Sequence, residues 1–135
     1  MNSLSALLLF ALWTLALMLF YVGWRGIEIL RGKPANSWTR GSDAALPGLV
    51  KRAEHAHLNC VENLPVFAAI VLGAAALSKS SAIESYAPLV LYARVAQSVT
   101  HLIGVTHVLV LLRAAFFFVQ IALMIWMVLR LLNCA

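Results

Sequence analysis

A regular pattern of four polar side chains stands in a segment that continues, from Leu64 to Leu77, as an almost wholly apolar run. The four are spaced i, i+3, i+7 and i+10: Arg52, His55, Asn59 and Glu62. Positions with these spacings lie within about 80° of each other on an α-helix. Lipid could not solvate such a stripe, because a charged group at mid-bilayer costs roughly 3 kcal/mol or more. We therefore predict that this stripe faces other helices or water and forms the functional site.

A second polar stripe lies on the next expected helix. It consists of Arg94, Gln97 or Ser98, and His101. At about 1.5 Å per residue, Glu62 and Arg94 reach similar depths in two antiparallel helices. Two charges that could not stand alone in lipid are expected to pair, so we predict an intramembrane ion pair between them.

The remaining polar groups are expected at the cytoplasmic end of the same site. His101 should lie level with His55 and Asn59, and Arg113 should stand at the cytoplasmic mouth. The face of Arg113 is continued by Phe117, Gln120 and Met124.

Each pattern also has a structural explanation. The pairing of Glu62 with Arg94 could fix the register of two helices without binding anything. Hydrogen bonding between helices would account for Asn59, Gln97 and Ser98. Anchoring at the lipid headgroups would account for Arg52 and Arg113. What favours a functional site is that several stripes meet at one depth.

Neither a metal site nor a disulfide framework is predicted. His55 and His57 differ by two positions and so point about 160° apart on a helix. The two cysteines, Cys60 and Cys134, are too few for a framework of bridges.

The composition sets the class of protein. Hydrophobic residues make up 63% of the sequence and charged residues 11%, with a mean hydropathy of +0.92. These values are typical of an all-α membrane protein with several spans, and 135 residues allow one domain, residues 1–135. The net charge of +5 lies mostly in one loop, so it reports topology and not a nucleic-acid partner.

Four spans fit the apolar runs. We expect them at about residues 4–24, 50–77, 86–106 and 112–132. The basic loop 25–49 should be cytoplasmic and both termini should lie outside the cytoplasm. The first run has no basic segment ahead of it and is read as a retained span, not as a cleaved signal peptide. Pro65 should bend the second helix, and the turn before the fourth span is placed between Gly104 and Arg113.

The motifs along the second to fourth helices resemble the MAPEG family, the membrane-associated proteins in eicosanoid and glutathione metabolism. The resemblance covers roughly residues 46–120. It is carried by Arg52-x6-Asn59-x2-Glu62-x2-Pro65-x-Phe67, by Arg94-Val95-Ala96 and by Arg113.

The resemblance implies a four-helix bundle assembled as a homotrimer, with glutathione as co-substrate between neighbouring protomers near the cytoplasmic surface. Matched residue by residue, it implies glutathione-binding roles for the polar residues of the second and third helices, which are Arg52, His55, Asn59, Glu62, Arg94, Gln97 and His101. It implies a catalytic role near the thiol for Arg113, with Ser98 as a second candidate donor. The sequence departs from some family enzymes at Phe117, where they have a tyrosine.

The expected activity is that of a glutathione-dependent transferase or peroxidase acting on lipophilic electrophiles, which would enter from lipid along the aromatic and methionine face of the fourth helix. The membrane is expected to be a bacterial inner membrane in preference to the endoplasmic reticulum, with the site facing the cytoplasm. One alternative is a membrane protein that binds a lipid-like ligand without catalysis. The other is a small channel or transporter subunit.

Overall fold

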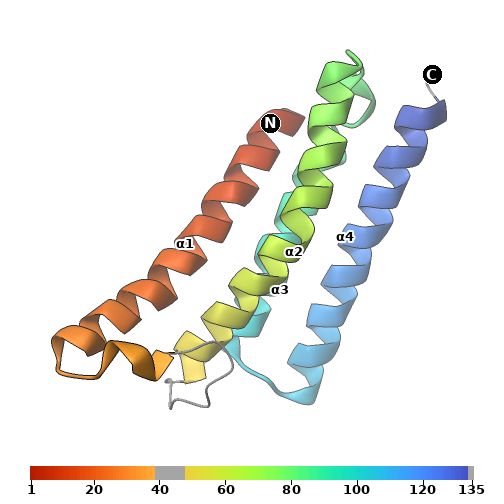
Figure 1. Cartoon of the computed structure of the whole chain (residues 1–135). Coiled ribbons are helices and arrows are strands. Elements are labelled where there is room, and N and C mark those ends of the chain that lie inside the picture. Colours follow the sequence, from red (N-terminus) through yellow and green to blue (C-terminus); the bar gives the residue numbers. More distant parts are fainter. Residues whose placement is uncertain (39–47, 134–135) are drawn as a thin grey trace.

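A computed structural model describes residues 1–38 and 48–133 of the chain, and this part is all-helical (Figure 1). Its elements are α1 (Ser3–Leu30), η1 (Ala35–Trp38), α2 (Gly48–Ala76), η2 (Ser80–Ala82), α3 (Ala87–Ile103) and α4 (His107–Asn133). The predicted all-α class is confirmed.

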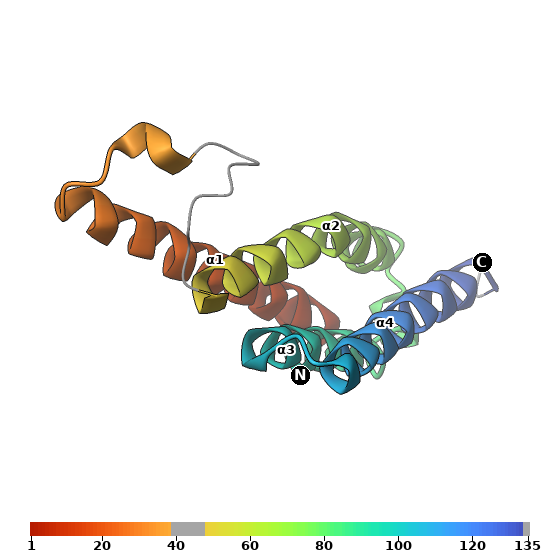
Figure 2. The same cartoon turned by 90° about the horizontal axis from the view of Figure 1, so that it is seen from below.

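The four α-helices run alternately up and down. Figure 1 shows both chain termini at one end of the bundle, and the end of α1, the start of α2 and the α3–α4 connection at the other. We call this second end the basic end, because Arg25, Lys51 and Arg52 lie there. Helix α1 packs against α2 and α3, whereas α4 packs against α3 and more lightly against α2. Figure 2 shows α1 leaving the bundle on one side and α4 on the other.

Three of the helices, α1, α2 and α4, are long and apolar enough to cross a membrane. Helix α3 has 17 residues and so measures about 25 Å, somewhat less than the ~30 Å hydrocarbon core of a bilayer. Much of the apolar surface of these helices points away from the bundle, α4 most of all. The chain is therefore an integral membrane protein.

The helix ends differ from the expected spans in two places. Helix α1 continues to Leu30, and the chain turns away at Gly32, whose φ of +96° is readily adopted only by glycine. Helix α4 begins at His107, so the turn before it comprises only residues 104–106. Arg113 consequently lies six residues after the start of α4. Helix α2 continues through Pro65, and the bend there stays a prediction.

The packed interior joins α1, α2 and α3. Phe10 and Phe67 are both fully buried, with ring centroids 5.7 Å apart. Small side chains such as Ala6, Ala56 and Ala74 are also buried and let the helix backbones approach closely. This packing fixes how α2 and α3 are rotated about their axes. It therefore decides which polar side chains face inward.

Candidate functional site

A pocket of about 330 Å³ opens between α2, α3 and α4, in the half of the bundle nearer the basic end. Its lining consists of Asn59, Gln97, Val110, Arg113, Ala114, Phe117 and Phe118. The predicted residues Asn59, Gln97 and Arg113 thus come together from three different helices. Phe117, at the position where the family resemblance would place a tyrosine, forms part of the wall.

Arg113 is held at this pocket by a histidine. Its Nη1 lies 2.6 Å from Nδ1 of His101 and 3.3 Å from Nε2 of the same ring. A guanidinium can only donate hydrogen bonds, so the closer ring nitrogen must accept. His101 is 5% exposed and belongs to α3, so the contact ties the start of α4 to the end of α3.

Two glutamines make a second link between α3 and α4. Nε2 of the fully buried Gln120 donates to Oε1 of Gln97 at 2.8 Å and to the carbonyl of Phe116 at 3.0 Å. The sequence placed Gln120 on the face of Arg113 but did not identify this pairing. No spacing in the sequence indicated it, because Gln97 lies six residues before the end of α3 and Gln120 thirteen residues after the start of α4.

Arg52 and His55 gather around the end of α3. Nε of Arg52 donates to the carbonyl of Leu102 at 3.0 Å, one of the last carbonyls of that helix, where a cation is favoured. The rings of His55 and His101 meet edge to face with centroids 6.0 Å apart. The prediction that His55 and His101 lie at one level is confirmed.

The predicted ion pair between Glu62 and Arg94 is wrong. Arg94 is 0% exposed and packs over the ring of Phe10, with 5.6 Å from Cζ to the ring centroid. Within residues 1–38 and 48–133, none of its three guanidinium nitrogens has a hydrogen-bond partner. Glu62 is exposed on the outside of α2. Cys60, two positions earlier, is one of the α2 residues that face inward. Two positions turn a helix by about 200°, so Glu62 points away despite its matching depth.

Ser98 does not reach the pocket within one chain. Its hydroxyl is buried, donates to the carbonyl of Arg94 at 3.0 Å and lies 3.7 Å from Sγ of Cys60. Arg94 does not line the pocket either. The predicted catalytic role of Ser98 and the predicted glutathione-binding role of Arg94 therefore have no direct geometry in the single chain and stay predictions.

The opposite side of α2 is tied to α1. Arg25 and Glu54 form an ion pair at 2.9 Å, and Nδ1 of His57 lies 3.0 Å from the carbonyl of Thr14. His55 and His57 thus contact different helices, α3 and α1. Within residues 1–38 and 48–133, no group of three or more His, Cys, Asp and Glu side chains could hold a metal ion.

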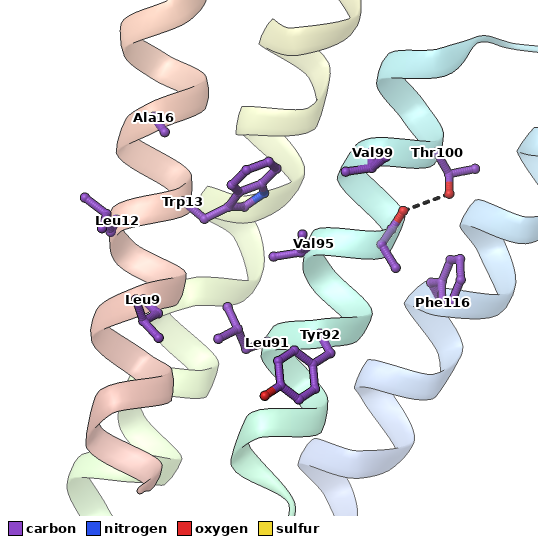
Figure 3. A pocket seen from close by; sticks show the side chains of 11 residues that line it. Leu9, Leu12, Trp13, Ala16, Leu91, Tyr92, Val95, Val99, Thr100 and Phe116 are labelled. Atoms are coloured by element: carbon purple, nitrogen blue, oxygen red, sulfur yellow. Dashed lines mark hydrogen bonds between the residues drawn. The ribbon is translucent and has the colours of Figure 1, made fainter. Parts of the chain in front are cut away.

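Apolar grooves lie beside the polar pocket. The larger, of about 820 Å³, runs between α1 and α3 (Figure 3). It is lined by Leu9, Leu12, Trp13, Ala16, Leu91, Tyr92, Val95, Ala96, Val99, Thr100 and Phe116. A smaller one, of about 270 Å³, runs between α2 and α4 and includes Val66, Ile121 and Met124. Both methionines on the face of α4 that was expected to admit a substrate are buried: Met124 is 4% exposed and lines this groove, whereas Met127 is fully buried and does not line it.

The fold and the site together define a class: a small helical membrane protein with a polar pocket, lined by Arg113, near one end of its bundle and apolar grooves beside it. Comparison with protein families narrows this class to one family. The model of the MAPEG family matches residues 3–133, nearly the whole chain, and the chain belongs to this family. Comparison with curated proteins and with solved structures gives no match. The resemblance seen in the sequence motifs is confirmed, and with it membership of a family of membrane proteins in eicosanoid and glutathione metabolism.

Proposed function

We propose that the protein binds glutathione in the pocket between α2, α3 and α4 and uses its thiol as a transferase or peroxidase acting on lipophilic electrophiles. The observation that carries this proposal is the meeting of Arg113, Asn59 and Gln97 at one pocket in a member of the MAPEG family. These residues come from three helices, so the pocket depends on the fold and not on one helix face.

The chemistry of glutathione suits the groups around the pocket. Its two carboxylates call for guanidinium donors such as Arg52. Its ammonium group calls for acceptors such as the side-chain amide oxygen of Asn59 or the carboxylate of Glu62. The ionised thiol is the nucleophile, and a nearby cation stabilises it. The hydroxyl of Ser98 already donates to a carbonyl, so we propose that Arg113 is the residue that stabilises the thiolate.

The proposal includes a homotrimer. Glu62 is exposed one helical turn from Asn59, on the outside of the single chain, where lipid would not solvate it. A neighbouring protomer would cover this carboxylate and complete the pocket, whose 330 Å³ is at the small end for a ligand site. The predicted role of Glu62 in binding therefore belongs to the assembled protein.

The lipophilic substrate would lie along α4. Phe117, Ile121 and Met124 are spaced at i, i+4 and i+7, which places them on one face. Phe117 lines the polar pocket, and the other two line the α2–α4 groove. This strip would bring an apolar molecule from the groove to the thiol. The proposal places the polar pocket toward the cytoplasm, in a bacterial inner membrane in preference to the endoplasmic reticulum, because the basic residues lie at that end.

A second candidate is a membrane protein that binds a lipid-like ligand without catalysis. The groove between α1 and α3 favours it, because its lining is almost entirely apolar and its 820 Å³ would hold a molecule of drug or lipid size. A channel or transporter subunit has less support. The polar pocket lies in the half nearer the basic end, whereas the other grooves described are apolar.

Thiol consumption with a generic electrophile tests the proposal. The unmutated protein in detergent should accelerate the loss of glutathione thiol, and Arg113→Leu should lower kcat/KM about a hundredfold, as expected when a charge-assisted contact to the reacting thiolate is lost. Arg130→Leu is the matched control, because Arg130 lies on the same helix at the far end and stacks over Tyr86. No acceleration by the unmutated protein would favour the binding protein instead.

A further inference from the structure

We propose that Gln120 is a positioning residue: it holds the side-chain amide of Gln97 with its N–H groups toward the pocket, where one of them donates to the thiolate of glutathione. This inference rests on the proposed function and adds to it a second donor for the thiolate, beside Arg113. It starts from the two hydrogen bonds that Nε2 of Gln120 donates, one to Oε1 of Gln97 at 2.8 Å and one to the carbonyl oxygen of Phe116 at 3.0 Å.

The backbone fixes which way round the amide of Gln120 lies. A carbonyl oxygen only accepts hydrogen bonds, so the group that faces the carbonyl of Phe116 must be the NH2 of Gln120 and not its oxygen. The same nitrogen faces Gln97, so the atom that Gln97 turns toward α4 must be its own oxygen. Turning either amide over would set two acceptors or two donors against each other. The orientation of both amides therefore follows from one backbone carbonyl.

This orientation decides what Gln97 offers to a ligand. Gln97 lines the pocket, and because its oxygen is engaged by Gln120, the end of its amide left for a ligand is the NH2 group, which only donates. Phe117, three residues before Gln120, lines the same pocket with a phenyl ring that has no donor to offer. Gln97 and Arg113 thus present donors from two different helices. An anionic acceptor atom such as a thiolate suits both.

Stability alone does not account for a glutamine at position 120. Its side chain is 0% exposed, and the other buried residues of α4 are apolar: Met124, Met127 and Leu131. In the part of the chain that the structure describes, the buried Oε1 of Gln120 has no hydrogen-bond partner. A buried acceptor left unpaired lowers stability, and an apolar side chain of similar size would avoid that cost. What the glutamine provides instead is the hold of its nitrogen on Gln97.

The test makes two measurements on the detergent-purified protein. The ultraviolet absorbance of the thiolate gives the pH at which half of the bound glutathione is ionised, which we call the ionisation midpoint. Calorimetry gives the affinity for S-hexylglutathione, a thioether with no thiol to ionise. The second ligand therefore reports binding without the proposed contact, because a thioether sulfur is only a weak acceptor.

Gln97→Met and Gln120→Met keep the side-chain length and remove the amide. Gln97→Met should raise the ionisation midpoint by about one pH unit, the loss of one hydrogen bond to a charged atom. Gln120→Met should raise it by about half a pH unit, because Gln97 keeps its N–H groups but loses their orientation. The affinity for S-hexylglutathione should stay within about twofold in both variants. Thr100→Val is the matched control: its hydroxyl donates to the carbonyl of Ala96 and it lines the α1–α3 groove, so its loss should change neither quantity.

An unchanged midpoint in Gln97→Met would overturn the hydrogen bond to the thiolate, and an unchanged midpoint in Gln120→Met would overturn its positioning role. An equal loss of S-hexylglutathione affinity would show that the glutamines only hold α3 and α4 together, which also overturns the inference. In these cases binding by the unmutated protein still supports the proposed function. If it binds neither compound, the proposed function fails and this inference with it. Asparagine, which shortens the amide by one methylene, is the second variant at either position if a methionine variant does not elute as the same oligomer.

Discussion

Arg94 shows at the scale of one residue why similar depth does not make a pair. Its guanidinium is fully buried, rests on the ring of Phe10 and has no hydrogen-bond partner, while the acid expected to meet it points away. A cation over an aromatic face gains roughly 2 kcal/mol when desolvated, less than the several kcal/mol that burying a charge costs. The buried charge of Arg94 therefore lowers the stability of the single chain.

Replacing Arg94 should stabilise the fold. Arg94→Met keeps most of the side-chain volume and removes the uncompensated charge, so we expect the free energy of unfolding in detergent to rise by about 1 kcal/mol or more. Glu62→Gln should change it by less than about 0.5 kcal/mol, because the carboxylate is exposed on the outside of α2. Denaturant unfolding followed by circular dichroism measures both. A loss of stability in Arg94→Met, matched by a loss in Glu62→Gln, would show that the two charges meet in the assembled protein.

At the scale of the elements, helix rotation and helix ends determine the site. The polar residues at i, i+3 and i+7 were correctly assigned to one face of α2, and His55 and Arg52 do meet α3. The direction in which the Glu62 side chain points around the axis of α2 could not be predicted, because it depends on how Cys60 and its neighbours pack inward. The start of α4 was also missed, since Val105 to Leu112 is as apolar as a span and carries no clear helix boundary.

Two glycines at the basic end of α1 should respond to substitution in opposite ways. Gly26 lies inside the helix with open space around it, so Gly26→Ala should stabilise by about 0.5–1 kcal/mol. Gly32 has a φ of +96°, and an alanine there should cost about 1–2 kcal/mol although no atom is near. Thermal unfolding of the two variants checks this. Equal shifts in Tm would contradict the described end of α1.

For the whole molecule, the sequence was sufficient for the class and the family. Composition alone indicates a polytopic membrane protein, and the motifs around Asn59, Arg94 and Arg113 indicate the MAPEG family, which the match over residues 3–133 confirms. The contacts between the helices could not be predicted from the sequence. The Arg113–His101 and Gln120–Gln97 contacts arise from the tight turn between α3 and α4, and their geometry exists only once the bundle has packed.

Glutathione binding by calorimetry on the detergent-purified protein tests the central claim most directly, with Asn59→Ala and Arg113→Ala as variants and Arg130→Ala as the control from the far end of α4. We predict saturable binding that each site variant weakens about tenfold or more and that Arg130→Ala leaves unchanged, in proteins that elute as the same oligomer. The unmutated protein failing to bind glutathione, or binding it equally well without Asn59 and Arg113 side chains, would contradict the account.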